Sequence, residues 1–202
     1  NVFQKNILGG LQEVYNEKLV ILNFPFVGSY PRRFKKLWFK GFRVKGISSY
    51  SFFNLFGLKL ISRFLVTFKA LLKVKPNAGS CIIIYSIHLP FLVAVTLYKT
   101  LICKNIKVVL IVPDLPEYMT SGDSRLVALL KKMQRQILKS CYKRVDGYVF
   151  LTEYMHEKIP AVINDYVIVE GVSKAGIVTL PLDLPNSIFY SGTLSSRYGI
   201  KE

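Results

Sequence analysis

The stretch SCIIIYSIHLPFLVAVTLYKTLICKNIKVVLIVPD, from Ser80 to Asp114, decides the fold. It holds two short apolar runs, at 80–86 and 107–112, and an apolar segment with helical character between them at 90–103. Strands covered on both faces read as continuous apolar runs, and parallel strands need a crossover of ten or more residues, usually a helix. The stretch therefore predicts one strand–helix–strand unit of a parallel sheet.

The same alternation continues outward from this unit in both directions. Further strands are predicted at 18–23, 42–46, 147–151, 166–170 and 187–190, and further helices at 3–15, 52–73, 123–143 and 153–159. This order indicates an α/β fold with a Rossmann-like, doubly wound parallel sheet. Because 173–186 contains Gly, Ser, Pro and Asp with little periodicity, we expect a domain at 1–172, a linker at 173–186 and the first strand of a second domain at 187–202.

Strong positive charge and high apolar content coexist in this chain. Its 202 residues include 28 Lys plus Arg against 12 Asp plus Glu, a formal net charge of +16, yet 51% are hydrophobic. That apolar content excludes a disordered basic tail. All the excess charge lies between Lys18 and Pro113, where there are sixteen basic residues and no acidic one. Such a field attracts an anionic partner: nucleic acid, an anionic membrane or a phosphorylated small molecule.

The segment Pro31–Gly46, PRRFKKLWFKGFRVKG, interleaves seven Lys and Arg residues with aromatic ones. This pattern suits a membrane interface, single-stranded nucleic acid or a plain solvated surface. No recognised nucleic-acid module accompanies it, so we expect an anionic membrane surface as a partner and no nucleic acid. The expected membrane-surface residues are Arg32, Arg33, Lys35, Lys36, Trp38 and Lys40.

Two helical features bear on the same question. The predicted helix at 52–73 places Lys59, Arg63 and Lys69 on one arc and its leucines opposite; we expect the apolar arc to pack on the sheet, leaving the basic arc for an anionic bilayer or for solvent. We expect no membrane-spanning helix, because the longest apolar stretch, Cys81 to Leu97, is interrupted by Ser86, His88 and Pro90.

Polar and ionisable residues follow the predicted strands, where open parallel sheets bind ligands. Asp114 ends the acid-free stretch and lies between two prolines at the end of the strand at 107–112. A carboxylate there suits orienting a sugar hydroxyl or stabilising positive charge, although Asp is equally typical of turns and helix N-caps. His88 suits either a hydrogen bond to a ligand or a structural role. No Ser-His-Asp order, HExxH motif or Walker-type loop is present.

Six segments together resemble bacterial family-4 glycosyltransferases, which are enzymes of polysaccharide and cell-envelope assembly. In chain order they are NFPFVGSYPRRFKKLWF, YSIHLPFLVA, LIVPDLPEYM, DGYVFLTEYM, YVIVEGV and IFYSGTLSSRYGIKE. The resemblance covers about 180 residues, from 23 to 202. It implies the N-terminal, acceptor-binding domain of a GT-B enzyme, located on the cytoplasmic side and peripheral on the inner face of the cytoplasmic membrane.

The resemblance also implies a reaction. A sugar would pass from a nucleotide-sugar, with retention of configuration and without metal or cofactor, to a glycan or lipid-diphosphate-linked acceptor. Asp114 would be catalytic. The acceptor would be bound by Phe26, Gly28, Ser29, His88 and Glu117, and the donor by Gly192, Thr193, Leu194 and Arg197.

This chain departs from the family pattern at both ends. No strand precedes the helix at 3–15, and the paired-glutamate motif of the donor site does not occur. We therefore expect a fragment that does not catalyse transfer alone. The alternative from another class is a non-catalytic basic module that binds an anionic membrane or nucleic acid.

Overall fold

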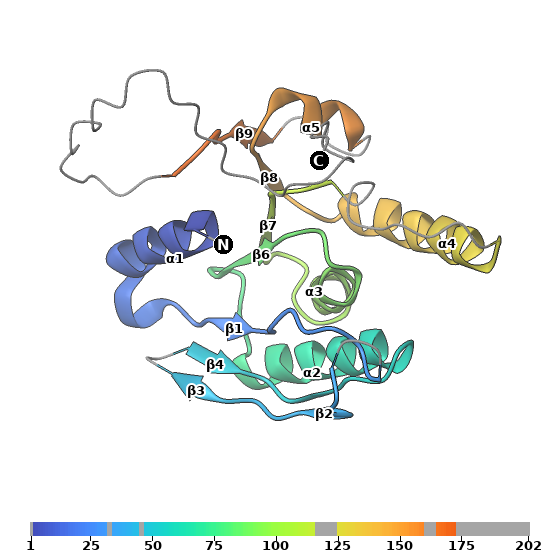
Figure 1. Ribbon diagram of the computed structural model, residues 1–202. Helices are drawn as coiled ribbons and strands as arrows, with labels where there is room; N and C mark the ends of the chain where they lie inside the picture. Colours follow the sequence, from blue (N-terminus) through green and yellow to red (C-terminus); the bar gives the residue numbers. More distant parts are fainter. Residues whose placement is uncertain (1, 32–33, 45–46, 116–124, 160–164, 173–202) are drawn as a thin grey trace, which may run out of the picture.

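A computed structural model describes residues 2–31, 34–44, 47–115, 125–159 and 165–172 (Figure 1). Its elements in chain order are α1 (Val2–Tyr15), a 3-10 turn η1 (Asn16–Lys18), β1 (Leu22–Asn23), β2 (Trp38–Phe39), β3 (Arg43–Val44), β4 (Ile47–Ser49), β5 (Phe52–Phe53), α2 (Leu58–Val74), β6 (Cys81–Tyr85), α3 (Leu89–Leu101), β7 (Lys107–Val112), α4 (Arg125–Tyr142), β8 (Gly147–Phe150), α5 (Glu153–Lys158) and β9 (Tyr166–Ile168).

A four-stranded parallel sheet in the order β6-β7-β8-β9 organises the fold. Its register pairs Ile84 with Leu110 and Val112 with Phe150. Helices α3, α4 and α5 connect successive strands, so the predicted Rossmann-like parallel α/β sheet is confirmed for the described residues. The strand at 107–112 has the predicted bounds, and β6 and β8 each differ from prediction by one residue at one or both ends.

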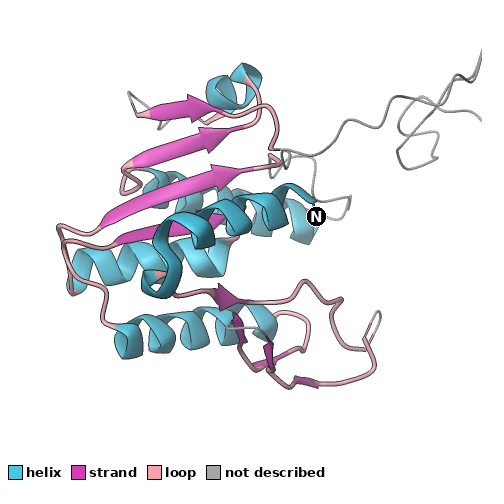
Figure 2. Ribbon diagram, turned by 90° about the vertical axis from the view of Figure 1, so that its left-hand side faces the viewer, coloured by secondary structure: helices cyan, strands magenta, loops and turns pink. Residues whose placement is uncertain are grey.

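Helices cover the sheet on two sides. Figures 1 and 2 show α1 on one face and α3 with α4 on the other. The ring of Phe3 in α1 lies 6.5 Å from the ring of Tyr85 at the end of β6. This arrangement explains the continuous apolar strands, because both faces of the central strand must be shielded from water.

The hydrophobic core lies between β7, its neighbours and α3. Val108, Leu110 and Val112 of β7 are fully buried, as is Leu92 of α3. The same cluster includes Phe150 of β8, Leu138 of α4 and Tyr98 of α3. Burying a large apolar side chain contributes about 1.5–3 kcal/mol, so this cluster is the main source of stability for the sheet.

A smaller lobe surrounds α2 below the main sheet (Figure 1). It contains a sheet in the order β1-β4-β3 and the antiparallel pair β2 and β5. The strand predicted at 18–23 is shorter than expected, because η1 occupies residues 16–18 and β1 holds only Leu22 and Asn23. The strand predicted at 42–46 corresponds to β3, which pairs with β4.

The helix predicted at 52–73 begins six residues later than expected. Phe52 and Phe53 form β5 instead, paired with Phe39 and Trp38 of β2. The ring of Phe52 is fully buried and stacks 5.0 Å from that of Phe39. Gly57 then adopts a φ of 83° immediately before α2, a conformation that glycine adopts without strain. Tertiary pairing of two aromatic residues therefore overrides the helical period.

The expected orientation of α2 is wrong in part, because each arc is divided between the inside and the outside: Leu71 of the apolar arc is buried, whereas Lys69 of the basic arc is exposed. Arg63 and Thr67, from the polar arc, are buried together with Ala70 and Leu71. Leu65, from the apolar arc, is exposed. The inward side of α2 meets α3 and β5. The reason is a polar contact network around Arg63, described below. The predicted linker at 173–186 and the strand at 187–190 lie outside the described residues.

Candidate functional site

The loop that follows β1, residues 24–30, is held by polar side chains of α2 and of Asn54, the residue after β5. Three side chains donate hydrogen bonds to carbonyl oxygens of this loop: Arg63 to Pro25, Lys59 to Val27 and Asn54 to Gly28. The Arg63 bond measures 2.6 Å and the Asn54 bond 2.9 Å. In addition, Tyr30 N donates to Asn54 O at 3.0 Å. We call Asn54, Lys59 and Arg63 the loop clamp, because they fix the path of the chain at this strand end.

Arg63 is the centre of the clamp and is 1% exposed. Its guanidinium lies over the ring of Phe52 at 4.4 Å and near that of Phe26 at 5.8 Å. Among the described residues it forms no ion pair with an acid, and its Nε has no hydrogen-bond partner. Burial lowers the Arg63 pKa to about 10. Among the described residues, this buried cation is therefore compensated by neutral partners: the Pro25 carbonyl oxygen, the His88 imidazole and two aromatic rings.

His88 lies beside this cation at the carboxyl end of β6. Its Nε2 is 2.9 Å from Arg63 Nη1. Because a guanidinium only donates, Nε2 accepts this hydrogen bond and the imidazole is neutral with its proton on Nδ1. Burial, with the charges of Arg63 and Lys59, lowers the His88 pKa to about 4. The predicted role of His88 as a hydrogen-bond donor thus rests on Nδ1 alone.

Lys59 occupies the less buried side of the clamp, one helical turn before Arg63. Burial and the charge of Arg63 lower the Lys59 pKa to about 8. Two cations at this spacing without an acid between them create a positive potential around the loop. An anionic group on a ligand would relieve this repulsion.

Asp114 follows the central strand β7 and is exposed. Burial and then the negative charge of Asp114 raise the pKa of Tyr85, at the end of the neighbouring strand. Since β6 and β7 are parallel, Tyr85, His88 and Asp114 all lie at the carboxyl ends of strands, the edge where such sheets bind ligands.

The predicted acceptor residues are partly brought together. Phe26 is 75% exposed, and its ring lies 5.2 Å from the imidazole of His88. Gly28 and Ser29 are half-buried in the same loop. Glu117 lies outside the described residues, as do the predicted donor residues Gly192, Thr193, Leu194 and Arg197. The sequence offered no clear signal for Asn54 and Arg63, since a polar residue near a helix is usually read as solvated.

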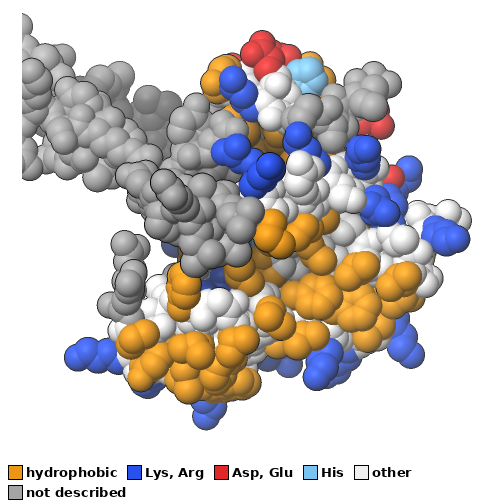
Figure 3. Space-filling view, turned by 90° about the vertical axis from the view of Figure 1, so that its right-hand side faces the viewer, with side chains coloured by type: hydrophobic (Ala, Val, Ile, Leu, Met, Phe, Trp, Pro, Cys, Tyr) orange, Lys and Arg blue, Asp and Glu red, His pale blue; other side chains and the backbone are white. Residues whose placement is uncertain are grey.

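Four of the six predicted membrane-surface residues are described, and all four are exposed. Lys35, Lys36, Trp38 and Lys40 are exposed around β2, whereas Arg32 and Arg33 lie outside the described residues. Figure 3 shows hydrophobic side chains interspersed with Lys and Arg over the lower part of one face, and acidic side chains only in its upper part. The charge asymmetry of the sequence is therefore also an asymmetry of this surface.

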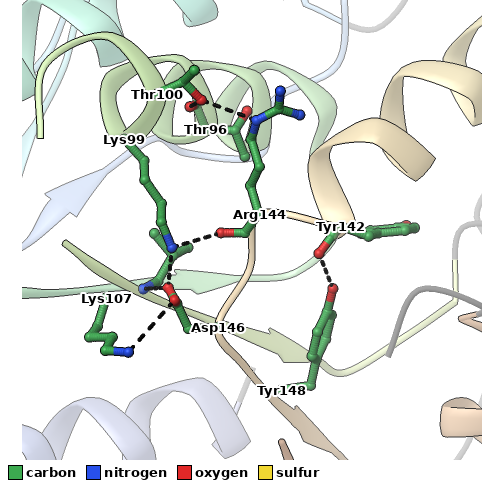
Figure 4. Close-up of polar contacts among 9 residues, drawn as sticks. Thr96, Lys99, Thr100, Lys107, Tyr142, Arg144, Asp146 and Tyr148 are labelled. Carbon is green, nitrogen blue, oxygen red and sulfur yellow. Dashed lines mark hydrogen bonds and ion pairs between the residues drawn. The ribbon is translucent and has the colours of Figure 1, made fainter. Parts of the chain in front are cut away.

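A second polar cluster lies at the amino-terminal edge of the sheet (Figure 4). Asp146 accepts hydrogen bonds from Lys99 Nζ at 2.5 Å and Val108 N at 2.7 Å, and Lys107 lies 3.9 Å away. Burial alone would raise the pKa of Asp146, but these hydrogen bonds and charges lower it. The contacts join α3 to β7 and to the start of β8, so this cluster stabilises the sheet at the edge opposite Asp114.

Comparisons of the chain with protein-family models, curated proteins and solved structures found no match. Within the described parts of the chain, no helix is long and apolar enough to span a bilayer. Nor do three or more His, Cys, Asp or Glu side chains gather there as a metal site would require.

Proposed function

We propose that this chain is the acceptor-binding half of a retaining glycosyltransferase of GT-B architecture. In this proposal a sugar passes from a nucleotide-sugar to an acceptor that carries a phosphate or diphosphate, such as a lipid-diphosphate-linked glycan. The proposal is supported by the resemblance of six segments to family-4 glycosyltransferases and by the Rossmann-like parallel sheet.

The proposal rests on one observation: a carboxylate and two cations lie at the same edge of the sheet. The exposed carboxylate of Asp114 follows β7. The two cations of the loop clamp, which form no ion pair among the described residues, lie beside the end of β6. Sugar transfer with retention develops positive charge on the sugar, which a nearby carboxylate stabilises. The acceptor phosphate is negative and favours the side of Lys59 and Arg63. The exposed ring of Phe26 offers a flat apolar surface for a sugar ring.

The complete gene product tests this proposal. It is incubated with a panel of nucleotide-sugars labelled in the sugar and with extracted membrane lipids, and labelled lipid or glycan is measured. We expect transfer from one donor, and we expect Asp114→Asn to lower turnover by about 100-fold or more. The matched control is Asp165→Asn, because Asp165 is also exposed but precedes β9 at the opposite edge of the sheet.

Binding of the acceptor is tested separately with Lys59→Gln. This variant keeps a hydrogen-bond donor for the Val27 carbonyl but removes the charge, so we expect a raised KM for a phosphate-bearing acceptor and little change in kcat. Equal turnover in the wild type and Asp114→Asn would rule out the catalytic role of Asp114. Absence of transfer from every donor would leave the non-catalytic binding module as the better description.

A further inference from the structure

The buried guanidinium of Arg63 lacks an anion that balances its charge. Arg63 is 1% exposed, and its Nε has no hydrogen-bond partner among the described residues. The groups in contact with it are neutral: the Pro25 carbonyl oxygen, the His88 imidazole and the rings of Phe26 and Phe52. Taking a cation out of water is costly unless an opposite charge compensates it. An anion beside Arg63 would therefore stabilise the folded protein.

The lobe around α2 provides no carboxylate for this purpose. No Asp or Glu occurs between Lys18 and Pro113, the stretch that contains the loop after β1, β5 and α2. In the parts of the chain that the structure describes, the acids that form ion pairs are Asp146 and Glu153, and neither pairs with a residue of the loop clamp. An anion at Arg63 therefore comes either from a bound ligand or from a modified side chain.

Lys59 is the side chain best placed to become that anion. It lies four residues before Arg63 on α2, and residues at this spacing are neighbours on a helix surface. Its Nζ donates a hydrogen bond to the Val27 carbonyl oxygen, so the amine is held in the loop clamp, and the side chain is half-buried. Burial and the charge of Arg63 lower the Lys59 pKa from 10.5 to about 8. A neutral, nucleophilic amine therefore forms more readily here than on an ordinary lysine.

We propose that Lys59 is a site of reversible carbamylation by carbon dioxide. The lone pair of the neutral Nζ attacks the carbon of CO2 and an N–C bond forms. One C=O electron pair moves onto oxygen, and the nitrogen releases a proton to solvent, so no oxidant or reductant is needed. The product is a carbamate anion one helical turn from Arg63. Its nitrogen keeps one hydrogen, which still donates to the Val27 carbonyl.

The same reaction is less favourable at other lysines of α2. Lys69 and Lys73 are exposed to water, and neither lies one turn from Arg63. A carbamate on either of them gains little, because water and salt screen its interaction with a distant cation. At Lys59, the modification replaces repulsion between two cations by an ion pair with a buried guanidinium.

The inference does not rest on sugar transfer, and its test uses no nucleotide-sugar. In the proposed enzyme, the carbamate and an acceptor phosphate exclude each other at Arg63. The complete protein is equilibrated at about pH 8, close to the Lys59 pKa, with isotopically labelled bicarbonate and dissolved CO2. An alkyl oxonium salt then converts any carbamate to a stable ester, which peptide mass spectrometry locates. We expect labelling of Lys59 to exceed that of Lys69 and Lys73 by about tenfold or more.

The matched variants are Lys59→Arg and Lys69→Arg. Arginine keeps the positive charge at each position, but its guanidinium stays protonated and does not react with CO2. Relative to chloride at equal pH and ionic strength, bicarbonate is expected to raise the thermal unfolding temperature of the wild type and of Lys69→Arg. The reason is that the carbamate pairs with Arg63 only in the folded state. We expect no such rise for Lys59→Arg, and circular dichroism checks that each variant is folded.

Three results would overturn the inference. The first is the absence of the labelled ester at Lys59. The second is equal labelling of Lys59, Lys69 and Lys73, which would indicate general amine reactivity rather than a specific site. The third is a bicarbonate-dependent rise in unfolding temperature that Lys59→Arg retains, because a bicarbonate ion bound without a covalent bond would then explain the effect.

Discussion

Acidification is expected to destabilise this protein through His88. The neutral imidazole accepts a hydrogen bond from Arg63 at 2.9 Å, and a protonated ring would place two donors and two positive charges against each other. The histidine pKa is 6.5 ordinarily and about 4 in the folded protein. Between these values the unfolded chain binds a proton that the folded chain does not, so the free energy of unfolding falls as pH falls.

The size of this effect follows from the two pKa values. Each pKa unit corresponds to about 1.4 kcal/mol, so the difference between 6.5 and about 4 corresponds to about 3 kcal/mol. This contribution is complete above pH 6.5, is lost as pH falls, and stops changing below about pH 4. For a domain of this size, 3 kcal/mol is a substantial share of the roughly 5–15 kcal/mol of total stability.

Urea unfolding followed by far-ultraviolet circular dichroism measures the effect at several pH values across this interval. Carboxylates also titrate near its lower end, so the informative quantity is the difference between wild type and His88→Gln. The glutamine oxygen still accepts from Arg63 but does not protonate, and we expect that variant to lose about 3 kcal/mol less than the wild type.

The second of the two histidines in the chain supplies the control. His156 lies in α5 and takes no part in the loop clamp, so His156→Gln, measured under the same conditions, controls for the replacement of a histidine by glutamine. If His88→Gln and the wild type lose the same stability across the interval, the inference that His88 is neutral in the folded protein is wrong.

Two further predictions concern the scaffold. Gly41→Ala is expected to cost about 1–3 kcal/mol of stability, because the added Cβ would lie 2.2 Å from the Ser49 carbonyl oxygen. Gly10→Ala is expected to stabilise α1 by about 0.5–1 kcal/mol, because the added Cβ would meet nothing within 4 Å. Thermal unfolding of the two variants measures these opposite effects. Asp146→Asn is expected to cost about 1–2 kcal/mol at neutral pH. The Asp146 pKa is lowered in the folded protein, so its contribution is complete above about pH 4 and is lost as pH falls further; a cost that does not shrink in acid would contradict the ion pair with Lys99.

The parallel sheet could be predicted from local sequence because its signal is local. The run CIIIY and the run VVLIV that follows Lys107 are continuously apolar, and β6 and β7 contain them. The smaller lobe could not be predicted in this way. Its strands hold two or three residues each, too few for any period to show, and they form because distant segments pair, as Phe52 does with Phe39.

The candidate site likewise contains residues that the sequence could predict and residues that it could not. Asp114 and His88 could be predicted, because polar residues directly after apolar strands mark the carboxyl edge of a parallel sheet. Phe26 and Gly28 were expected from the resemblance, and their loop does lie against His88. Arg63 and Asn54 could not be singled out, because their partners are carbonyl oxygens of Pro25 and Gly28, and backbone acceptors have no signature in sequence.

The sequence alone determined the main sheet, the place of Asp114 and the confinement of the excess charge to residues 18–113. Only the tertiary structure decided which side of α2 faces inward. Helical periodicity separates a basic arc from an apolar one, and the larger apolar arc ordinarily packs inside. Here Arg63 meets the Pro25 carbonyl oxygen, an imidazole and two aromatic rings on the inner side. Those contacts join residues distant in the chain, so they arise only when the fold is complete, and they leave Leu58, Leu65 and Leu72 of α2 on the surface.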